Sequence, residues 1–557
     1  MRKTFIALCL AATACTAAAQ NDRDHNFDVA KNLNIFNAIY KNLDMMYVDT
    51  LDADDVVGYG IQAMLRSLDP YTEYYPEKEV KNLRQMITGK YAGIGALIRE
   101  NLKEGCCMID QPYKGMPAHE LGLHKGDLIL AIDDSTMIGK PTGYVSSHLR
   151  GDAGSTFKLK IRRLSTGKEM TYNITRRAIQ MPAVTYYGML GNNIGYINLD
   201  TYTEDCAKDV RRAFVDLRQQ GMKKLIFDVR DNGGGSVSEA VSIINMFVPR
   251  NTTILTMKGK IKRANNEYKT SVEPIDTIMP IVVLVNENTA SASEITAGVL
   301  QDLDRAVVMG TRTFGKGLVQ TTMELPYRGQ LKLTTSKYYI PSGRCIQAIN
   351  YKHNKGGYTE HVPDSLTKIF HTLGGREVRD GGGIKPDVEI KGDTLTNLAY
   401  YIMGVRDSSE VVFNYEYDYI NAHPSIAEPD KFMISDDDFD ELKRRLVASN
   451  FKYDKQTEKY LDQLKKLAKF EGYYEDARPE FEALEAKLTH NLERDMEINR
   501  QLIKELVSRN ICRYYYYDGG AMQHSLRSDT QVKRAVEILE NEDEYNSILH
   551  PTNDRKN

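Results

Sequence analysis

The spacing of apolar residues changes along this chain, and each change predicts a different kind of element. Over residues 27–85 apolar side chains recur every three or four positions, which is the period of an amphipathic helix. The clearest stripe consists of Ile35, Ile39, Leu43 and Met46. From residue 89 to about residue 179 the apolar residues form short runs instead, and residues 157–161 alternate with polar ones like a half-buried strand. We therefore expect N-terminal helices followed by a small β domain.

Between about residues 184 and 390, uninterrupted apolar runs alternate with helical segments. Strands are predicted at residues 194–197, 225–229, 281–285 and 306–309, and helices at residues 206–220, 237–247 and 291–300. Strands that are apolar throughout are typical of a buried parallel sheet, so we expect an α/β layer that holds the catalytic core. Beyond about Arg406 the chain becomes rich in Lys, Glu and Asp, which predicts a helical appendage without evident chemistry.

The first residues have the pattern of a secretory signal. Basic residues precede an apolar run at residues 5–12, and three alanines end at Ala19, after which we expect cleavage. Residues 12–15 resemble a weak lipoprotein box, so a lipid anchor on Cys15 is the minority alternative. No later stretch approaches the roughly 20 apolar residues of a membrane helix. We expect an exported, periplasmic protein without a transmembrane helix in its mature chain.

Composition excludes several classes of function. The chain of 557 residues has 73 Lys and Arg against 76 Asp and Glu, so it lacks the basic excess that would hold nucleic acid. Past the signal the cysteines are odd in number and widely spaced, and no Cys or His cluster has zinc spacing. We expect no disulfide framework, no metal site and no cofactor.

The segment from Asn288 to Ile295 carries the strongest candidate for chemistry. It follows a predicted buried strand and opens a helix with Ser291, where free N–H groups and the helix dipole favour the oxyanion of acyl transfer. The same spacing of Ser291 and Glu294 is also that of a capping box, in which the hydroxyl only satisfies the helix end. This structural alternative is strong while the segment stands alone.

A second segment, from Gly310 to Gln320, favours the catalytic interpretation of Ser291 over the capping one. Lys316 lies between glycines and apolar residues, and a lysine acts as a general base only where burial lowers its pKa. Gly310, Gly315 and Lys316 also nearly match a phosphate-binding loop. However, Gly317 stands where that motif needs Ser or Thr, so nucleotide binding is disfavoured. A serine and a lysine together would form a variant of the serine-histidine-acid arrangement.

The third segment, Asp228 to Gly235, ends another apolar strand with three consecutive glycines. Such glycines let backbone N–H groups approach a ligand closely, or they form a plain turn between strand and helix. Together, these three segments resemble the C-terminal processing peptidases, also called tail-specific proteases, and the resemblance covers roughly residues 25–390. The most specific signatures are Ser-Ala-Ser-Glu-Ile and Phe-Gly-Lys-Gly-x-Val-Gln.

The resemblance implies the roles of the site residues. Lys316 follows Ser291 by 25 residues, the separation that places the nucleophile at Ser291 and not at Ser293. Lys316 would be the general base, Gln320 would orient its amine, and Asp302 would have a supporting role. The oxyanion hole would combine the N–H of Ala292 with that of Gly234 or Gly235.

The β domain resembles the inserted PDZ domain of the same family. Its carboxylate-binding loop would comprise Tyr91, Ala92, Gly93, Ile94 and Gly95. A PDZ domain adds an extended peptide as a strand and binds its terminal carboxylate with N–H groups. The implied partners are protein substrates with unstructured C-terminal tails, and the C-terminal helices could serve an adaptor or self-association.

The expected architecture is a multidomain α+β protein whose α/β core is ClpP/crotonase-like by resemblance. Its parts are a signal (1–19), a helical region (20–88), the PDZ domain (89–182), the serine peptidase core (183–405) and a helical C-terminal region (406–557). The expected function is an exported serine endopeptidase that uses Ser291 and Lys316. The alternative is a catalytically silent PDZ scaffold that only binds protein C-termini.

Overall fold

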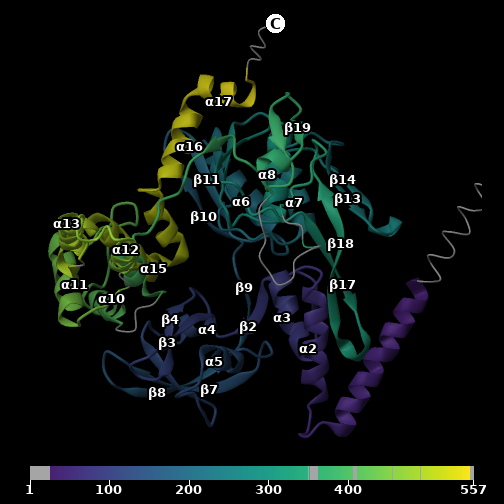
Figure 1. Ribbon diagram of the computed structural model, residues 1–557. Helices are drawn as coiled ribbons and strands as arrows, with labels where there is room; N and C mark the ends of the chain where they lie inside the picture. Colours follow the sequence, from purple (N-terminus) through teal and green to yellow (C-terminus); the bar gives the residue numbers. More distant parts are fainter. Residues whose placement is uncertain are drawn as a thin grey trace, which may run out of the picture. The chain divides into compact units, whose positions relative to one another are not determined.

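The computed structural model describes residues 25–348, 351, 362–405, 410–453, 456–489 and 491–551 (Figure 1). The predicted signal at residues 1–19, with Cys15, lies outside the described residues. The chain forms two compact units. One contains the described residues up to Pro76 together with Thr322–Leu333 and Tyr351, and the other contains the remaining described residues.

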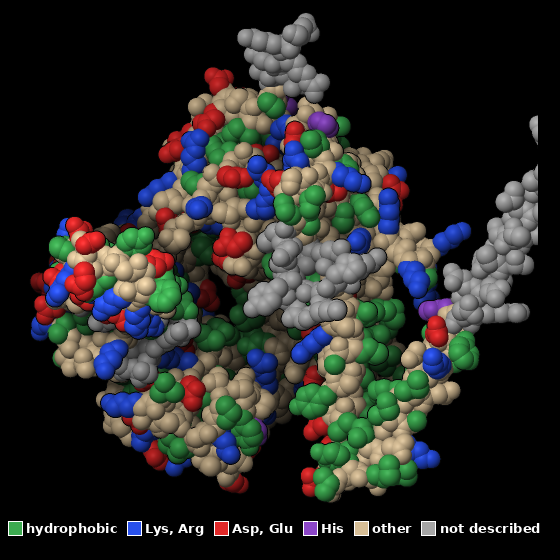
Figure 2. Space-filling model, viewed as in Figure 1, with side chains coloured by type: hydrophobic (Ala, Val, Ile, Leu, Met, Phe, Trp, Pro, Cys, Tyr) green, Lys and Arg blue, Asp and Glu red, His purple; other side chains and the backbone are tan. Residues whose placement is uncertain are grey.

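The first unit confirms the predicted N-terminal helices. One helix covers residues 25–46, and α2 (Ala53–Arg66) begins where the Asp52 side chain accepts the N–H of Asp55. Strand β1 (Glu73–Tyr75) pairs antiparallel with the start of β18 (Gln330–Tyr339). The apolar stripe of the first helix stays exposed, and Figure 2 shows green side chains along it at the lower right.

In the second unit, residues 90–180 form the predicted β domain. Six strands make an antiparallel sheet, five of them in the order β3 (Ala96–Asn101), β4 (Cys106–Pro112), β5 (Asp127–Ile132), β7 (Thr156–Arg163) and β8 (Glu169–Thr175), while β6 (Ser135–Thr136) pairs with β5. Side chains alternate between buried and exposed along the first part of β7, which confirms the alternation expected there. The short helices α4 (Pro117–Glu120) and α5 (Thr142–Leu149) belong to the same domain, while β2 (Lys90–Gly93) pairs separately with β9 (Arg177–Gln180).

The predicted α/β layer is a six-stranded sheet. Its order is β10 (Val184–Met189), β11 (Ile194–Leu199), β12 (Lys224–Asp228), β15 (Ile281–Val285), β16 (Val307–Gly310) and β21 (Val388–Glu389). All neighbours except β10 and β11 are parallel, so the carboxyl ends of β12, β15 and β16 meet at one edge. One face packs against α6 (Cys206–Gln219), α7 (Val237–Ile244) and α8 (Ala292–Asp302). The three candidate segments therefore begin at one edge of the sheet, where ligands of such folds bind.

A second, antiparallel sheet carries further residues of the candidate site. Its five strands are β1, β13 (Thr253–Gly259), β14 (Asn266–Lys269), β17 (Leu318–Glu324) and β18, and β17 pairs with β18.

The C-terminal region is helical, as predicted, but the expectation of an appendage is wrong for its last part. Helices α10 (Val411–Ala422), α11 (Asp436–Ala448) and most of α15 (Arg500–Leu526) share a separate core. In contrast, α16 (Thr530–Glu540) and α17 (Glu542–Leu549) pack on the second face of the parallel sheet. A sheet whose strands are apolar on both faces must be covered by other elements on both faces. The charged outer surfaces of α16 and α17 hid this role in the sequence.

The surface of the C-terminal helices carries charges of both signs. On the face that Figure 2 shows, basic and acidic side chains are interspersed over this region, in keeping with the net charge of -3. Within the described ranges, no helix combines the length and apolarity that crossing a membrane requires.

Candidate active site

Ser291 stands where the turn after β15 enters α8. It is the N-cap residue, with φ 58° and ψ -116°, a backbone conformation that is unfavourable for a residue with a side chain. Strain of this kind persists where the surroundings impose it, and it is concentrated at functional sites. Ser293 is fully buried inside the helix, and its hydroxyl donates to the Asn232 carbonyl at 3.0 Å. Ser291 is thus the serine at the strained entrance, and Ser293 is engaged in packing.

Glu294, in the first turn of α8, connects the serine with the lysine segment. Its carboxylate accepts the N–H groups of Ser291 (2.8 Å), Gly315 (2.7 Å) and Lys316 (2.8 Å), and the hydroxyl of Thr313 (2.5 Å). Burial raises the pKa of Glu294 to about 7, although these four donors oppose the shift. The sequence indicated Glu294 only as a capping partner. Its hydrogen bonds to residues distant in the chain were not predicted, because no sequence pattern marks them.

Tyr338 on β18 makes a second connection between the two segments. Its buried hydroxyl donates to the Lys316 carbonyl oxygen at 2.7 Å and lies 3.3 Å from the Ser291 carbonyl oxygen. Gly315 supports the same turn with φ 86°, and a β-carbon there would lie 2.3 Å from the Ala348 β-carbon. The structure therefore brings the backbones of Ser291 and Lys316 together through two buried side chains.

Gln320 and Asp302 lie in different surroundings. The Gln320 side chain, on β17, donates to the Thr334 hydroxyl at 3.1 Å. Asp302 is the last residue of α8, roughly 16 Å along the helix from Ser291. It forms a buried ion pair with Arg344 at 2.8 Å and accepts the N–H of Ser342 at 3.0 Å. Asp302 thus anchors the chain after β18 to the far end of the helix.

The glycine loop lies directly against Ser291. A β-carbon on Gly234 would lie 2.5 Å from the Ala290 carbonyl oxygen and 2.8 Å from the Ser291 β-carbon, so only glycine fits. The N–H of Gly234 is occupied, because it donates to the Asn232 side chain at 2.9 Å. Among the described residues, the N–H groups of Gly235 and Ala292 have no acceptor. Of the two predicted oxyanion pairs, the structure favours Ala292 with Gly235.

An ion pair that was not predicted from the sequence stabilises the same glycine loop. Arg230 pairs with Asp228 at 2.6 Å and with Asp529 at 2.8 Å, and it donates to Gln531 at 2.7 Å. Tyr196 donates its hydroxyl to Asp228 at 2.6 Å. The loop is therefore tied to the helical cover of the sheet as well as to the sheet itself.

The predicted PDZ loop begins inside a strand. Tyr91, Ala92 and Gly93 pair with β9, whereas Gly95 turns the chain into β3 with φ 71°. Within the described residues β3 pairs with β4 alone, so its other edge is unpaired. An unpaired strand edge that follows a glycine turn is what addition of a peptide strand requires.

Three family profiles match this chain. They are described as Peptidase family S41 (residues 193–361), PDZ domain (108–163) and Probable PDZ-protease, C-terminal helical domain (400–539). The last match assigns the C-terminal helices to a known domain type, which the sequence patterns alone had not done.

Relatives agree with these profiles. The chain is 32% identical over 374 residues to a carboxy-terminal-processing protease of Bartonella bacilliformis, covering 66% of this chain and 85% of that protein. It is 34% identical over 323 residues to a probable CtpA-like serine protease of Staphylococcus haemolyticus, covering 57% and 62%. A solved photosystem II D1 C-terminal processing protease is 26% identical and covers 64% of this chain and 86% of its own, with a TM-score of 0.35. The chain therefore belongs to the carboxy-terminal-processing proteases of peptidase family S41 and is a serine peptidase with a PDZ domain.

Proposed function

We propose that this protein is an exported endopeptidase that processes C-terminal tails, with Ser291 as its nucleophile and Lys316 as its general base. The observation that carries this proposal is the position of Glu294, whose single carboxylate accepts the N–H groups of both residues. These two hydrogen bonds fix the position of the two predicted catalytic segments relative to each other. Such positioning supplies a large part of the rate of acyl transfer.

In the proposed reaction the Ser291 Oγ attacks the carbonyl carbon of the scissile peptide bond. The neutral Lys316 amine takes the hydroxyl proton and returns it to the leaving amine, and water then hydrolyses the acyl-enzyme. The amide nitrogen of Gln320 is bound to Thr334, which leaves its oxygen to accept from the lysine amine. The N–H groups of Gly235 and Ala292 would stabilise the oxyanion.

Substrate selection is assigned to the PDZ domain. The loop from Tyr91 to Gly95 would bind the terminal carboxylate, and the free edge of β3 would pair with the tail as an added strand. The leader pattern at residues 1–19 supports export to the periplasm. The C-terminal helices remain the candidate surface for an adaptor or for self-association.

Cleavage of an unfolded reporter with an apolar C-terminal tail tests the catalytic assignment. We expect Ser291→Ala and Lys316→Arg to abolish cleavage while both variants stay folded and bind the tail. Ser293→Ala is the matched control and should keep activity, because Ser293 only donates to a backbone carbonyl. Activity that survives in Ser291→Ala would refute the nucleophile. Tail binding without cleavage by the unaltered protein would favour the scaffold instead.

A further inference from the structure

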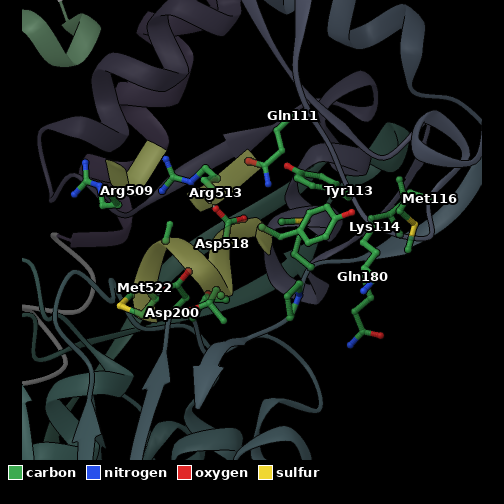
Figure 3. Close-up of a pocket in the computed structure, with 18 of the residues that line it drawn as sticks. Gln111, Tyr113, Lys114, Met116, Gln180, Asp200, Arg509, Arg513, Asp518 and Met522 are labelled. Atoms are coloured by element: carbon green, nitrogen blue, oxygen red, sulfur yellow. Dashed lines mark hydrogen bonds and ion pairs between the residues drawn. The ribbon is translucent and has the colours of Figure 1, made fainter. Parts of the chain in front are cut away.

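A cavity separate from the candidate active site lies beside α15. Its volume is about 780 Å³, and its walls come from the β domain, from the segment joining that domain to the parallel sheet, and from α15 (Figure 3). This volume falls in the range of sites for small ligands. Ser291, Lys316, Gln320 and the predicted PDZ loop are not among its lining residues.

Two opposite charges face this cavity without neutralising each other. Asp200, which follows β11, and Arg509, on α15, both line it but form no ion pair. In the part of the chain that the structure describes, the Arg509 Nε is buried without an acceptor, whereas the Asp200 side chain is exposed on the cavity wall. Leaving the buried Arg509 Nε unsatisfied is costly, so a ligand carboxylate would be stabilised beside it, and the Asp200 carboxylate on the same cavity favours a ligand that also carries a positive charge.

The other cationic residues that line the cavity already have interaction partners. Arg513 already pairs with Asp518 at 2.9 Å. Lys114 lies over the ring of Tyr517, 5.8 Å from its centroid. Arg509 lies in the field of the Glu416 carboxylate, but its buried Nε is a donor that a ligand carboxylate can still fill, and Figure 3 shows Arg509 on the same cavity as Asp200.

The remaining wall is apolar and is shaped by a distortion in α15. Tyr517 interrupts the helix with φ 61° and ψ -163°, and its hydroxyl lies 3.3 Å from His119 Nε2 of the β domain. Apolar and aromatic residues complete the wall, including Tyr113, Met116, Ile179 and Met522. The surroundings impose this backbone conformation, which places Tyr517 against the β domain.

We propose that this cavity binds a short peptide whose two ends are both free. Arg509 would bind its terminal carboxylate, Asp200 its terminal ammonium, and the apolar wall a side chain between them. This mode differs from strand addition by a PDZ domain, which needs the carboxylate but leaves the peptide's other end unread. A dianionic ligand such as a phosphate ester would be repelled by Asp200. The proposal does not depend on which residue is the catalytic nucleophile.

Three forms of one tripeptide test the proposal. Alanyl-leucyl-alanine with free ends, its N-acetylated form and its C-terminal amide are titrated into the full chain carrying Ser291→Ala, and binding is followed by calorimetry. We expect acetylation and amidation each to weaken binding about ten- to a hundredfold, because each removes a charge-assisted hydrogen bond.

Substitutions assign the two ends. Asp200→Asn should weaken binding of the free tripeptide and leave the acetylated form unchanged. Arg509→Gln should weaken the free form and leave the amide unchanged. Arg211→Gln, an exposed arginine on α6, is the matched control and should change none of the three.

Two results would overturn the proposal. One is equal binding of the free and acetylated tripeptides, which would mean that only the carboxylate is recognised, as in a PDZ groove. The other is no saturable binding of any form at millimolar concentration. The comparison of the three tripeptides uses the unaltered cavity. It therefore tests the proposal even if a substituted variant fails to fold.

Discussion

Helix α8 has a buried carboxylate near each end, and the two are satisfied differently. Glu294, in the first turn, accepts three backbone N–H groups and one hydroxyl, and none of these four donors in the described part of the chain belongs to a cationic group. Asp302, in the last turn, pairs with the guanidinium of Arg344. The helix dipole favours a negative charge at the first position and disfavours it at the second, where a cation is needed. Glu294 joins the two segments proposed to be catalytic, whereas Asp302 and its arginine partner join structural segments.

The largest expected effect concerns the structural end. Arg344→Met should lower the free energy of unfolding by about 3–5 kcal/mol, because it leaves the Asp302 carboxylate buried without its charge partner. Denaturant unfolding of the full chain measures this. The double variant Asp302→Leu/Arg344→Met should recover most of the loss, since two apolar residues leave no buried charge. A loss below about 1 kcal/mol in the single variant would show that the pair does not hold this end of α8.

The pH dependence of stability distinguishes the end of α8 that carries Glu294 from the end that carries Asp302. The pKa of Glu294 is raised from 4.5 to about 7, so between these values the folded state keeps a proton that the unfolded state has lost. Its contribution to the free energy of unfolding is therefore full below pH 4.5 and is lost as the pH rises to 7. At 1.36 kcal/mol per pH unit, the loss is roughly 3 kcal/mol.

Glu294→Gln removes this titration. We expect the stability difference between the unaltered protein and this variant to fall as the pH rises from 4.5 to 7, measured by denaturant unfolding at each pH. A difference that stays constant over that range would contradict the raised pKa. Glu287→Gln, at an exposed glutamate in the turn between β15 and α8, is the matched control for the loss of a carboxylate.

The same substitution should also slow catalysis. A glutamine turns one acceptor oxygen into an NH₂ group that faces N–H donors, so the Ser291 and Lys316 segments would move apart. A misplacement of about 1 Å costs on the order of a hundredfold in rate. Reporter cleavage measures kcat/KM for Glu294→Gln against the Glu287→Gln control. Full activity would show that Glu294 does not position the two segments.

The two ends of α8 also show what the sequence could reveal. Apolar runs predicted the sheet and its helices, because burial on both faces leaves a direct compositional pattern. Ser291 and Lys316 were predicted as site residues because motifs of local spacing carry them. The role of Glu294 was missed, since three of its four bonds reach residues at least 19 positions away. The Arg344 partner of Asp302 was missed for the same reason, because the two residues are 42 positions apart.

The smallest expected effect isolates the second connection between the segments. Tyr338→Phe keeps the buried ring but removes the hydrogen bond to the Lys316 carbonyl oxygen, which should cost about 1 kcal/mol and reduce kcat/KM several-fold. Tyr339→Phe is the matched control, because Tyr339 is only partly buried and a phenylalanine keeps its ring contact with Lys258. The ratio of the two variants' kcat/KM values then measures the hydroxyl of Tyr338 alone. A ratio of one would leave Glu294 as the sole connection that matters for catalysis, whereas a loss as large as that of Glu294→Gln would mean that the two connections act as a single unit.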